Sequence, residues 1–296
     1  MSGTIIDDFE TPFEIVEPDE QTTPLVFNSP HSGRVYPRAF LQASRLDPLT
    51  LRRSEDSFVE ELFSGVTGLG APLMQAHFPR AYLDVNREPY ELDPRMFDGR
   101  LPAFANTRSM RVAGGLGTIA RIVGDAQEIY ARRLPVEDAL LRIELLYKPY
   151  HRALQRLLQR TQRKFGMAVL IDCHSMPSAQ AQRDEAGRSD FVIGDRYGTS
   201  ASAVFADVID GALRSRGYTV TRNKPYAGGY ITEHYGNPVA HCHALQLEVS
   251  RSLYMDERRF VRSEGFALVA RDVVGVAAEL AEVVQLHLGG GRLAAE

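Results

Sequence analysis

The sequence predicts an α/β protein, a three-layer α/β/α sandwich whose mixed, mostly parallel sheet is covered by helices. Apolar runs typical of strands alternate with segments of helical spacing: strand-like runs lie at 24–28, 167–173 and 243–249, and helical ones at 135–164 and 199–215. Such alternation favours helices on both faces of one sheet. Two of the strand-like runs lead into a histidine, His31 and His174. Because ligands of open α/β sheets bind where strands pass into loops, the pattern also predicts a site there.

The remaining elements follow from the same patterns. We expect a helix at 48–64, strands at 72–77, 81–86, 190–193 and 217–222, and a closing helix at 256–286. Residues 135–164 are expected to form one long helix or a pair of helices, interrupted near Pro149. Residues 88–121 are rich in Gly, Pro and Arg without a clear period, which is typical of a functional loop. With no repeat and no linker, residues 1–296 are predicted to form a single catalytic domain, in which 1–20 is an irregular N-terminal segment.

Composition narrows the possible partners. The chain has 296 residues, 44% of them hydrophobic, and a formal net charge of −4, which argues against nucleic acid or an anionic membrane as partner. No apolar run reaches the roughly 18 residues of a membrane helix. The acidic N-terminus lacks the features of a secretion signal, and Cys173 and Cys242 are the only cysteines. We therefore expect a cytoplasmic protein that acts on a small molecule, with an oligomeric state that the sequence leaves open.

Two histidines presented next to strands are candidate ligands of one metal ion. His31 follows the run Leu25–Ser29, and His174 follows the run that begins at Met167. A single histidine after a strand is more often a hydrogen-bonded structural residue, and this alternative stays open for each. A metal site needs a third ligand, a general base and groups that hold the substrate.

Two further segments supply candidates for those roles. Arg80 to Arg87 contains arginines suited to binding a carboxylate, with Asn86 beside them, although Arg87 could equally form a surface ion pair with Glu88 or Glu91. In 243–251, alternation places Gln246, Glu248 and Ser250 on the face opposite Leu245, Leu247 and Val249. A carboxylate in a central strand suits a general base, and its structural alternative is an ion pair between Glu248 and Arg251.

These motifs together resemble the N-formylglutamate amidohydrolase family, the deformylases of one histidine-degradation route. The resemblance runs from about residue 24 to about residue 260, and rests on NSPHSGRVYP (28–37), SEDSFVEELF (54–63), FPRAYLDVNREPYELDPRMF (78–97), KPYHRAL (148–154), DCHSMPS (172–178), NKPYAGGYITEHYGNP (223–238) and HALQLEVSRSLYMDE (243–257). That family is similar to zinc carboxypeptidases and aspartoacylases, which implies a zinc-carboxypeptidase-like (phosphorylase/hydrolase-like) fold.

The resemblance also implies a ligand set and an order of site residues: His31, a carboxylate near 55–56, Arg80, Asn86 with Arg87, His174 and Glu248. One position departs from the carboxypeptidase pattern, because Arg34 stands where that pattern has the carboxylate ligand. Asp56 is the preferred third ligand and Glu55 the alternative. Asp172 is a further candidate, better suited to orienting an imidazole.

The implied reaction is hydrolysis of N-formyl-L-glutamate to formate and L-glutamate, with one divalent metal ion, expected to be Zn²⁺, as cofactor. Glu248 would be the base, Arg80 would stabilise the oxyanion, and Asn86 and Arg87 would bind a carboxylate. The second substrate carboxylate requires another cation, and Arg108, Arg111 and Arg121 are the candidates. The glycines of Pro225–Tyr230 predict either a mobile pocket wall or a plain turn. A zinc amidohydrolase for another N-acyl amino acid, and a non-catalytic binding protein on the same fold, are the rival functions.

Overall fold

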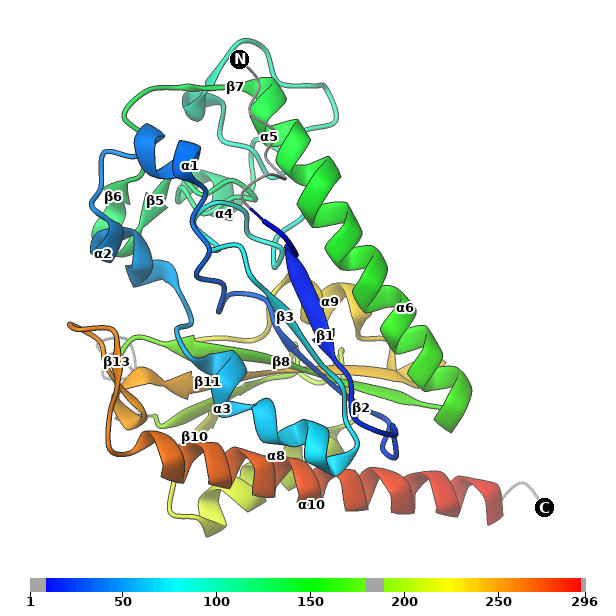
Figure 1. Ribbon diagram of the computed structural model, residues 1–296. Coiled ribbons are helices and arrows are strands. Elements are labelled where there is room, and N and C mark those ends of the chain that lie inside the picture. The colour runs from blue at the N-terminus through cyan, green and yellow to red at the C-terminus, as the bar shows by residue number, and fades with distance from the viewer. Residues whose placement is uncertain (1–8, 179–188, 294–296) are drawn as a thin grey trace. The chain divides into compact units, whose positions relative to one another are not determined.

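The computed structural model describes residues 9–178 and 189–293 (Figure 1). Its main sheet has seven strands in the order β1-β3-β2-β8-β11-β9-β10. The strands are β1 (Phe13–Val16), β2 (Leu25–Ser29), β3 (Leu73–Ala76), β8 (Ala168–Met176), β9 (Phe191–Gly194), β10 (Val220–Arg222) and β11 (Cys242–Ser250). β8 pairs in parallel with β2 and β11, and β9 pairs in parallel with β10 but antiparallel with β11. The predicted mixed, mostly parallel sheet is confirmed.

The chain divides into two compact units. The sheet unit comprises Ile15–Ser29, Phe58–Met74 and Gln155–Glu296, and the loop-rich unit comprises Met1–Glu14, Pro30–Ser57 and Gln75–Leu154. The polypeptide passes repeatedly from one to the other, and β1, β3 and the helix α6 have residues in both. The expectation of one domain over 1–296 stays a prediction.

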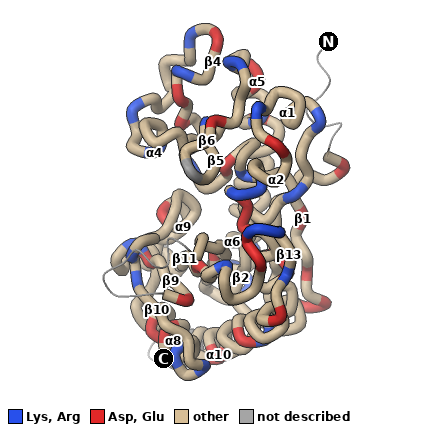
Figure 2. The backbone as a smooth tube through the Cα atoms, turned by 90° about the vertical axis from the view of Figure 1, so that its left-hand side faces the viewer, with Lys and Arg blue, Asp and Glu red and all other residues tan. Residues whose placement is uncertain are grey.

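In the sheet unit, helices lie on both faces of the strands (Figure 1). On one face are α3 (Val59–Leu62), α8 (Ala203–Ser215) and α10 (Phe266–Leu293), and on the other are α9 (Tyr230–Tyr235) and the last part of α6. α8 and α10 run side by side in both views (Figure 1 and Figure 2). They cover a core to which the strands contribute alternate residues, among them Phe27, Ile171, Cys173, Leu245 and Leu247. The residues between them, Asn28, Asp172, His174, Gln246 and Glu248, therefore point to the opposite face.

The loop-rich unit contains short elements. Its helices are α1 (Arg38–Ala43), α2 (Pro48–Leu51), α4 (Met110–Ala113) and α5 (Val136–Arg142), and its small sheets pair β4 (Phe97–Asp98) with β7 (Leu134–Pro135) and β5 (Ile122–Val123) with β6 (Gln127–Glu128). Residues 88–121 are mostly irregular, as expected. The predicted long helix is α5 followed by α6 (Lys148–Phe165), with a π-helical turn at Ile143–Tyr147 between them. That turn ends two residues before Pro149, and it lets the helix continue past a residue that lacks an N–H group.

The predicted helix at 48–64 is wrong. α2 ends at Leu51, a 3₁₀ turn follows at Arg52–Ser54, and α3 begins only at Val59. Two features break the helix: the backbone of Glu55 is extended, and Phe58 has a left-handed φ of 68°. Residues 55–57 are instead held by polar contacts, one of them from the Asp56 N–H to the His31 carbonyl at 3.0 Å.

The predicted strand at 81–86 is a turn. The N–H groups of Tyr82 and Leu83 both donate to the Pro79 carbonyl, and the Asp84 carboxylate accepts the Asn86 N–H at 2.8 Å. Asp side chains compete with strand pairing by making such local bonds.

Three boundaries also differ from the prediction. Residues 255–262 contain a hairpin, β12 (Met255–Asp256) with β13 (Val261–Arg262), so the closing helix starts at Phe266. The Asp256 carboxylate accepts two backbone N–H groups of the hairpin turn. The N-terminal segment is not wholly irregular, because Phe13–Val16 forms β1, and residues 1–8 lie outside the described residues. β8 continues through His174 to Met176, so this histidine lies within a strand and not beyond its end.

Candidate active site

In the sheet unit, the ends of β8 and β11 place His174 beside Glu248. The two residues are register partners across the parallel pair, as are Asp172 and Gln246. All four side chains are buried, with exposed fractions of 0–6%. Residues two apart on a strand share a face, so this pairing gathers a histidine and a carboxylate on the face away from the apolar core.

A chain of hydrogen bonds orients the His174 imidazole. Asn28 Nδ2 donates to Asp172 Oδ1 at 2.8 Å, and Asp172 Oδ2 lies 2.9 Å from His174 Nε2. With its carboxylate on Nε2, the ring presents Nδ1 as the nitrogen for a ligand. Metal-binding histidines are commonly fixed in this way, by a carboxylate on the second ring nitrogen.

Glu248 is held by Gln246. Gln246 Nε2 donates to Glu248 Oε1 at 2.8 Å, and Gln246 Oε1 accepts the Gly229 N–H at 2.7 Å. The second bond fixes which end of the amide faces Glu248. The predicted structural alternative pairs Glu248 with Arg251, whose Nε donates to Ser175 Oγ at 3.0 Å. An amide donor to one oxygen suits a carboxylate that acts as a proton acceptor.

In the loop-rich unit, His31 lies between two carboxylates. Its Nε2 is 2.7 Å from Asp84 Oδ1, and its Nδ1 is 3.4 Å from Asp56 Oδ2. Two ligand atoms that each lie about 2.0–2.2 Å from one tetrahedral ion are about 3.3–3.6 Å apart. The separation of Nδ1 from Oδ2 therefore fits two ligands of one metal ion.

Glu55 has a different environment from its neighbour Asp56. Its carboxylate accepts from Arg52 Nε at 3.1 Å, Tyr36 Oη at 2.6 Å and Ser57 Oγ at 2.8 Å. Burial, followed by the nearby Glu55 charge, raises the pKa of Tyr36 well above its ordinary value, so the phenol stays a donor. These bonds occupy the Glu55 carboxylate, and they favour Asp56 over Glu55 as a ligand.

Asp84 joins the histidine to the predicted substrate-binding segment. Besides His31, it accepts from Arg80 Nη2 at 2.8 Å, and Arg87 Nη2 lies 3.6 Å away. Burial raises the pKa of this carboxyl, but the charges of Arg87, His31 and Arg80 outweigh burial and hold it well below its ordinary value. Asp84 is thus a buried anion that positions three cationic or polar groups. Arg80 is predicted to stabilise the oxyanion, and one of its nitrogens, Nη2, donates to Asp84.

Backbone carbonyls fix Arg87. Its Nε donates to Leu116 O and its Nη1 to Asn86 O, both at 2.8 Å. Its side chain is 13% exposed. The alternative predicted for Arg87 was a surface ion pair with Glu88 or Glu91. The contacts described for this side chain are instead with the two carbonyls and with Asp84.

The three candidates for a second cation differ in their surroundings. Arg121 donates to Asp93 at 2.9 Å and to Glu128 at 3.1 Å, and it lines a separate cavity of about 200 Å³ in the loop-rich unit. Arg108 is exposed. Arg111 lies 4.0 Å from the buried Glu91, and its charge acts on Arg87. Of the three, Arg111 is the one associated with Arg87.

Sequence reasoning missed the roles of Asp84, Gln246 and Asn28. Each lies on a polar face of a predicted strand or next to a named candidate, so alternation was the available signal. The glycine segment 225–229 is irregular and lies against β9 and β11. A Cβ on Gly194 would be 2.6 Å from the Gly228 N–H nitrogen, so this close approach requires glycine.

His31, Asp56 and His174 are all buried, and each offers a side-chain atom suited to binding a metal ion. They are the residues that the sequence predicts as metal ligands. In 9–178 and 189–293, no helix is long and apolar enough to cross a membrane.

Comparison with known proteins agrees with these observations. The family model described as N-formylglutamate amidohydrolase matches residues 23–255. The N-formylglutamate deformylases of Pseudomonas putida and Pseudomonas aeruginosa are 29% and 28% identical to this chain; each alignment covers 79% of this chain, and 82% and 83% of the respective relative. The crystal structure of N-formylglutamate amidohydrolase from Ralstonia eutropha JMP134 has a TM-score of 0.88 and 36% identity, and the match covers 93% of this chain and 99% of that one. The chain belongs to the N-formylglutamate amidohydrolase family, whose members are hydrolases acting on an amide bond.

Proposed function

We propose that this protein hydrolyses N-formyl-L-glutamate to formate and L-glutamate with the help of one divalent metal ion, held by His31, Asp56 and His174. The observation that carries the proposal is the pairing of each histidine with a carboxylate on Nε2, from Asp84 and from Asp172. This arrangement fixes both rings with Nδ1 as the ligand atom. The name of the relatives supports the choice of substrate. Zinc is the proposed metal, and the family resemblance implies a place in histidine degradation.

A zinc ion bound there would supply Lewis acidity, polarising the formyl oxygen and lowering the pKa of the attacking water. Glu248 accepts the proton of that water through the carboxylate that Gln246 orients. It then delivers the proton to the amide nitrogen, so that the C–N bond breaks and the amine leaves neutral. The water oxygen becomes part of formate, and the hydrolysis consumes no reactant other than the substrate and this water.

Arg87 supports the choice of a substrate with a carboxylate. Its guanidinium is buried and fixed by two backbone carbonyls. A planar fork of this kind suits bidentate binding of a carboxylate. Arg80 is proposed to stabilise the developing oxyanion, and Asn86 to assist Arg87.

The test is a substrate panel with the purified protein and measured metal content. N-formylglutamate, N-acetylglutamate and N-formimidoylglutamate are compared by kcat/KM, with release of formate measured directly. We expect about one zinc per chain and the highest kcat/KM for the formyl compound. A preference for the acetyl compound would favour the rival amidohydrolase, and a protein that binds these compounds without hydrolysing any would be the non-catalytic alternative.

A further inference from the structure

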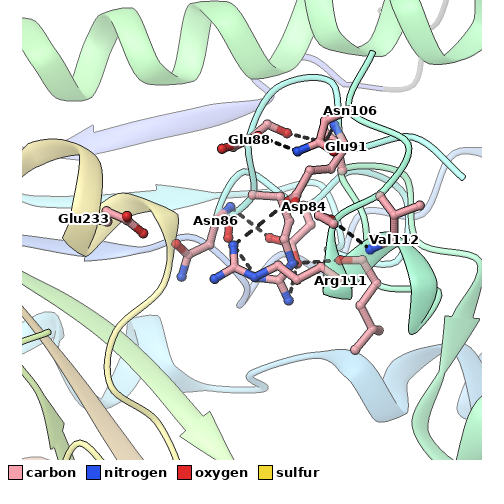
Figure 3. Close-up of polar contacts among 12 residues, drawn as sticks. Asp84, Asn86, Glu88, Glu91, Asn106, Arg111, Val112 and Glu233 are labelled. Carbon is pink, nitrogen blue, oxygen red and sulfur yellow. Dashed lines mark hydrogen bonds and ion pairs between the residues drawn. The ribbon is translucent and has the colours of Figure 1, made fainter.

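The pairing of Arg111 with Glu91 points to a second anion-binding group in the loop-rich unit. Glu91 is buried, with its side chain 5% exposed, whereas the side chain of Arg111 is 35% exposed. The two charges are 4.0 Å apart, which is too far for a hydrogen bond. Among the described residues, Glu91 Oε2 is a buried oxygen that accepts no hydrogen bond. Glu91 therefore attracts Arg111 without occupying its donors (Figure 3).

The surrounding charges leave this group cationic. In the ion pairs of the described residues, Arg80 and Arg87 both face the carboxylate of Asp84, and Arg111 faces that of Glu91. Asp84 is already engaged by His31 and Arg80. The charges of both other guanidinium groups act on Arg87. Burial first, and then the charges of Arg80 and Arg111, lower the pKa of Arg87 to about 10, although the charges of Asp84 and Glu91 raise it. Another carboxylate placed here would relieve that repulsion.

Resting on the proposed function, we propose that Arg111 binds the second carboxylate of a dicarboxylic N-acyl amino acid, while Glu91 positions Arg111 and Arg87 binds the first. Arg111 is then the residue that makes the enzyme select an acidic side chain. Glu91 is a positioning residue, because it acts through Arg111. The more exposed position of Arg111 allows its guanidinium to move from Glu91 to the substrate.

The experiment compares three substrates: N-formylglutamate, N-formylglutamine, which replaces the side-chain carboxylate by an amide, and N-formyl-4-aminobutyrate, which lacks the α-carboxylate. We expect Arg111→Met to lower kcat/KM for N-formylglutamate by about ten- to hundredfold, because a charge-assisted contact is lost. The same variant should change kcat/KM for N-formylglutamine by less than about threefold. Arg87→Lys should instead affect both of these substrates and spare N-formyl-4-aminobutyrate.

Arg100→Met is the matched control, because Arg100 is an exposed arginine of the same irregular segment. It should leave all three values unchanged. Glu91→Gln tests positioning: KM for N-formylglutamate should rise while kcat is retained and the values for N-formylglutamine stay near those of the wild type. Thermal melting of every variant checks the fold, and Arg111→Lys replaces Arg111→Met if the latter is unfolded.

Equal losses on N-formylglutamate and N-formylglutamine in the Arg111 variants would overturn the inference. It would also be overturned by a wild-type enzyme that hydrolyses both substrates equally well, although the proposed deformylase activity would then survive. A wild-type protein that releases formate from none of the substrates would instead refute the proposed function, and the inference with it.

Discussion

Asp84 Oδ1 lies 2.7 Å from His31 Nε2, and the same carboxylate accepts a hydrogen bond from Arg80. One buried anion thus orients a proposed metal ligand and a proposed oxyanion group. In the sheet unit, Asp172 orients His174 in the same manner and is itself held by Asn28. The two imidazoles have equivalent partners although their carboxylates lie on different elements, a turn and a strand.

Asp84→Asn is expected to weaken metal binding by about 10- to 100-fold, the usual effect of removing a carboxylate partner of a ligand histidine. Zinc affinity is measured by competition with a chelator. Asp172→Asn is the parallel variant and should have a similar effect. Unchanged affinity in both variants would show that these carboxylates do not support metal binding through the histidines.

Asp56→Asn and Glu55→Gln should separate a ligand from a structural carboxylate. The first is expected to lower zinc content, with a modest effect on thermal stability. The second should keep zinc but lower the melting temperature, because Glu55 is fully buried and accepts bonds from Tyr36, Arg52 and Ser57. Loss of zinc in Glu55→Gln alone would move the ligand by one residue, and retention of zinc in both would make Asp172 the leading carboxylate.

The parts of the fold that the sequence predicted are those with strong apolar periodicity. β2, β8 and β11 are buried along nearly their whole length, and this kind of run is recognised without knowledge of partners. The segments 54–58 and 81–86 were assigned wrongly because hydrogen bonds of polar side chains, and not an apolar period, determine their backbone conformation. The carboxylates of Glu55 and Asp84 bond to near neighbours in the sequence and also to Tyr36 and His31, which only the folded chain brings near.

The candidate site was predicted in a similar way. His31, His174 and Glu248 follow from apolar runs that end in polar residues. Alternation alone placed Glu248 opposite the apolar face, and the register of β8 with β11 then set it beside His174. Register depends on long-range pairing, and single-sequence patterns do not contain it. The preference for Asp56 over Glu55, and that for Arg111 among three arginines, likewise depended on side-chain contacts that a single-sequence pattern does not contain.

Glu248→Gln should retain zinc and lose about two to four orders of magnitude in kcat, the range for a general acid–base group. Glutamine preserves shape and keeps a partner for Gln246, but it cannot accept the proton. The control is Ser252→Ala, which removes a hydroxyl that pairs with Ser250 Oγ just after the same strand. Near-normal turnover would make Glu248 structural, whereas loss of zinc would make it a ligand.

A pH-dependent loss of stability is expected from His243 at the start of β11. Burial, and then the nearby His241 and His287, lowers its pKa from 6.5 to about 4. Its Nδ1 accepts the Ser202 N–H at 3.1 Å, and a protonated ring cannot accept this bond. Between pH 6.5 and about 4 the unfolded chain binds this proton and the folded chain does not, so stability rises with pH in that window and falls as pH is lowered through it.

The variant His243→Gln removes the titrating group and keeps an acceptor for the Ser202 N–H. We expect its melting temperature to fall less than that of the wild type between pH 6.5 and pH 4.5, even if the two proteins differ in stability at pH 7.5. Thermal melts across this range, monitored by circular dichroism in buffers of equal ionic strength, measure the difference in slope. Parallel curves for the two proteins would assign the acid sensitivity to other groups.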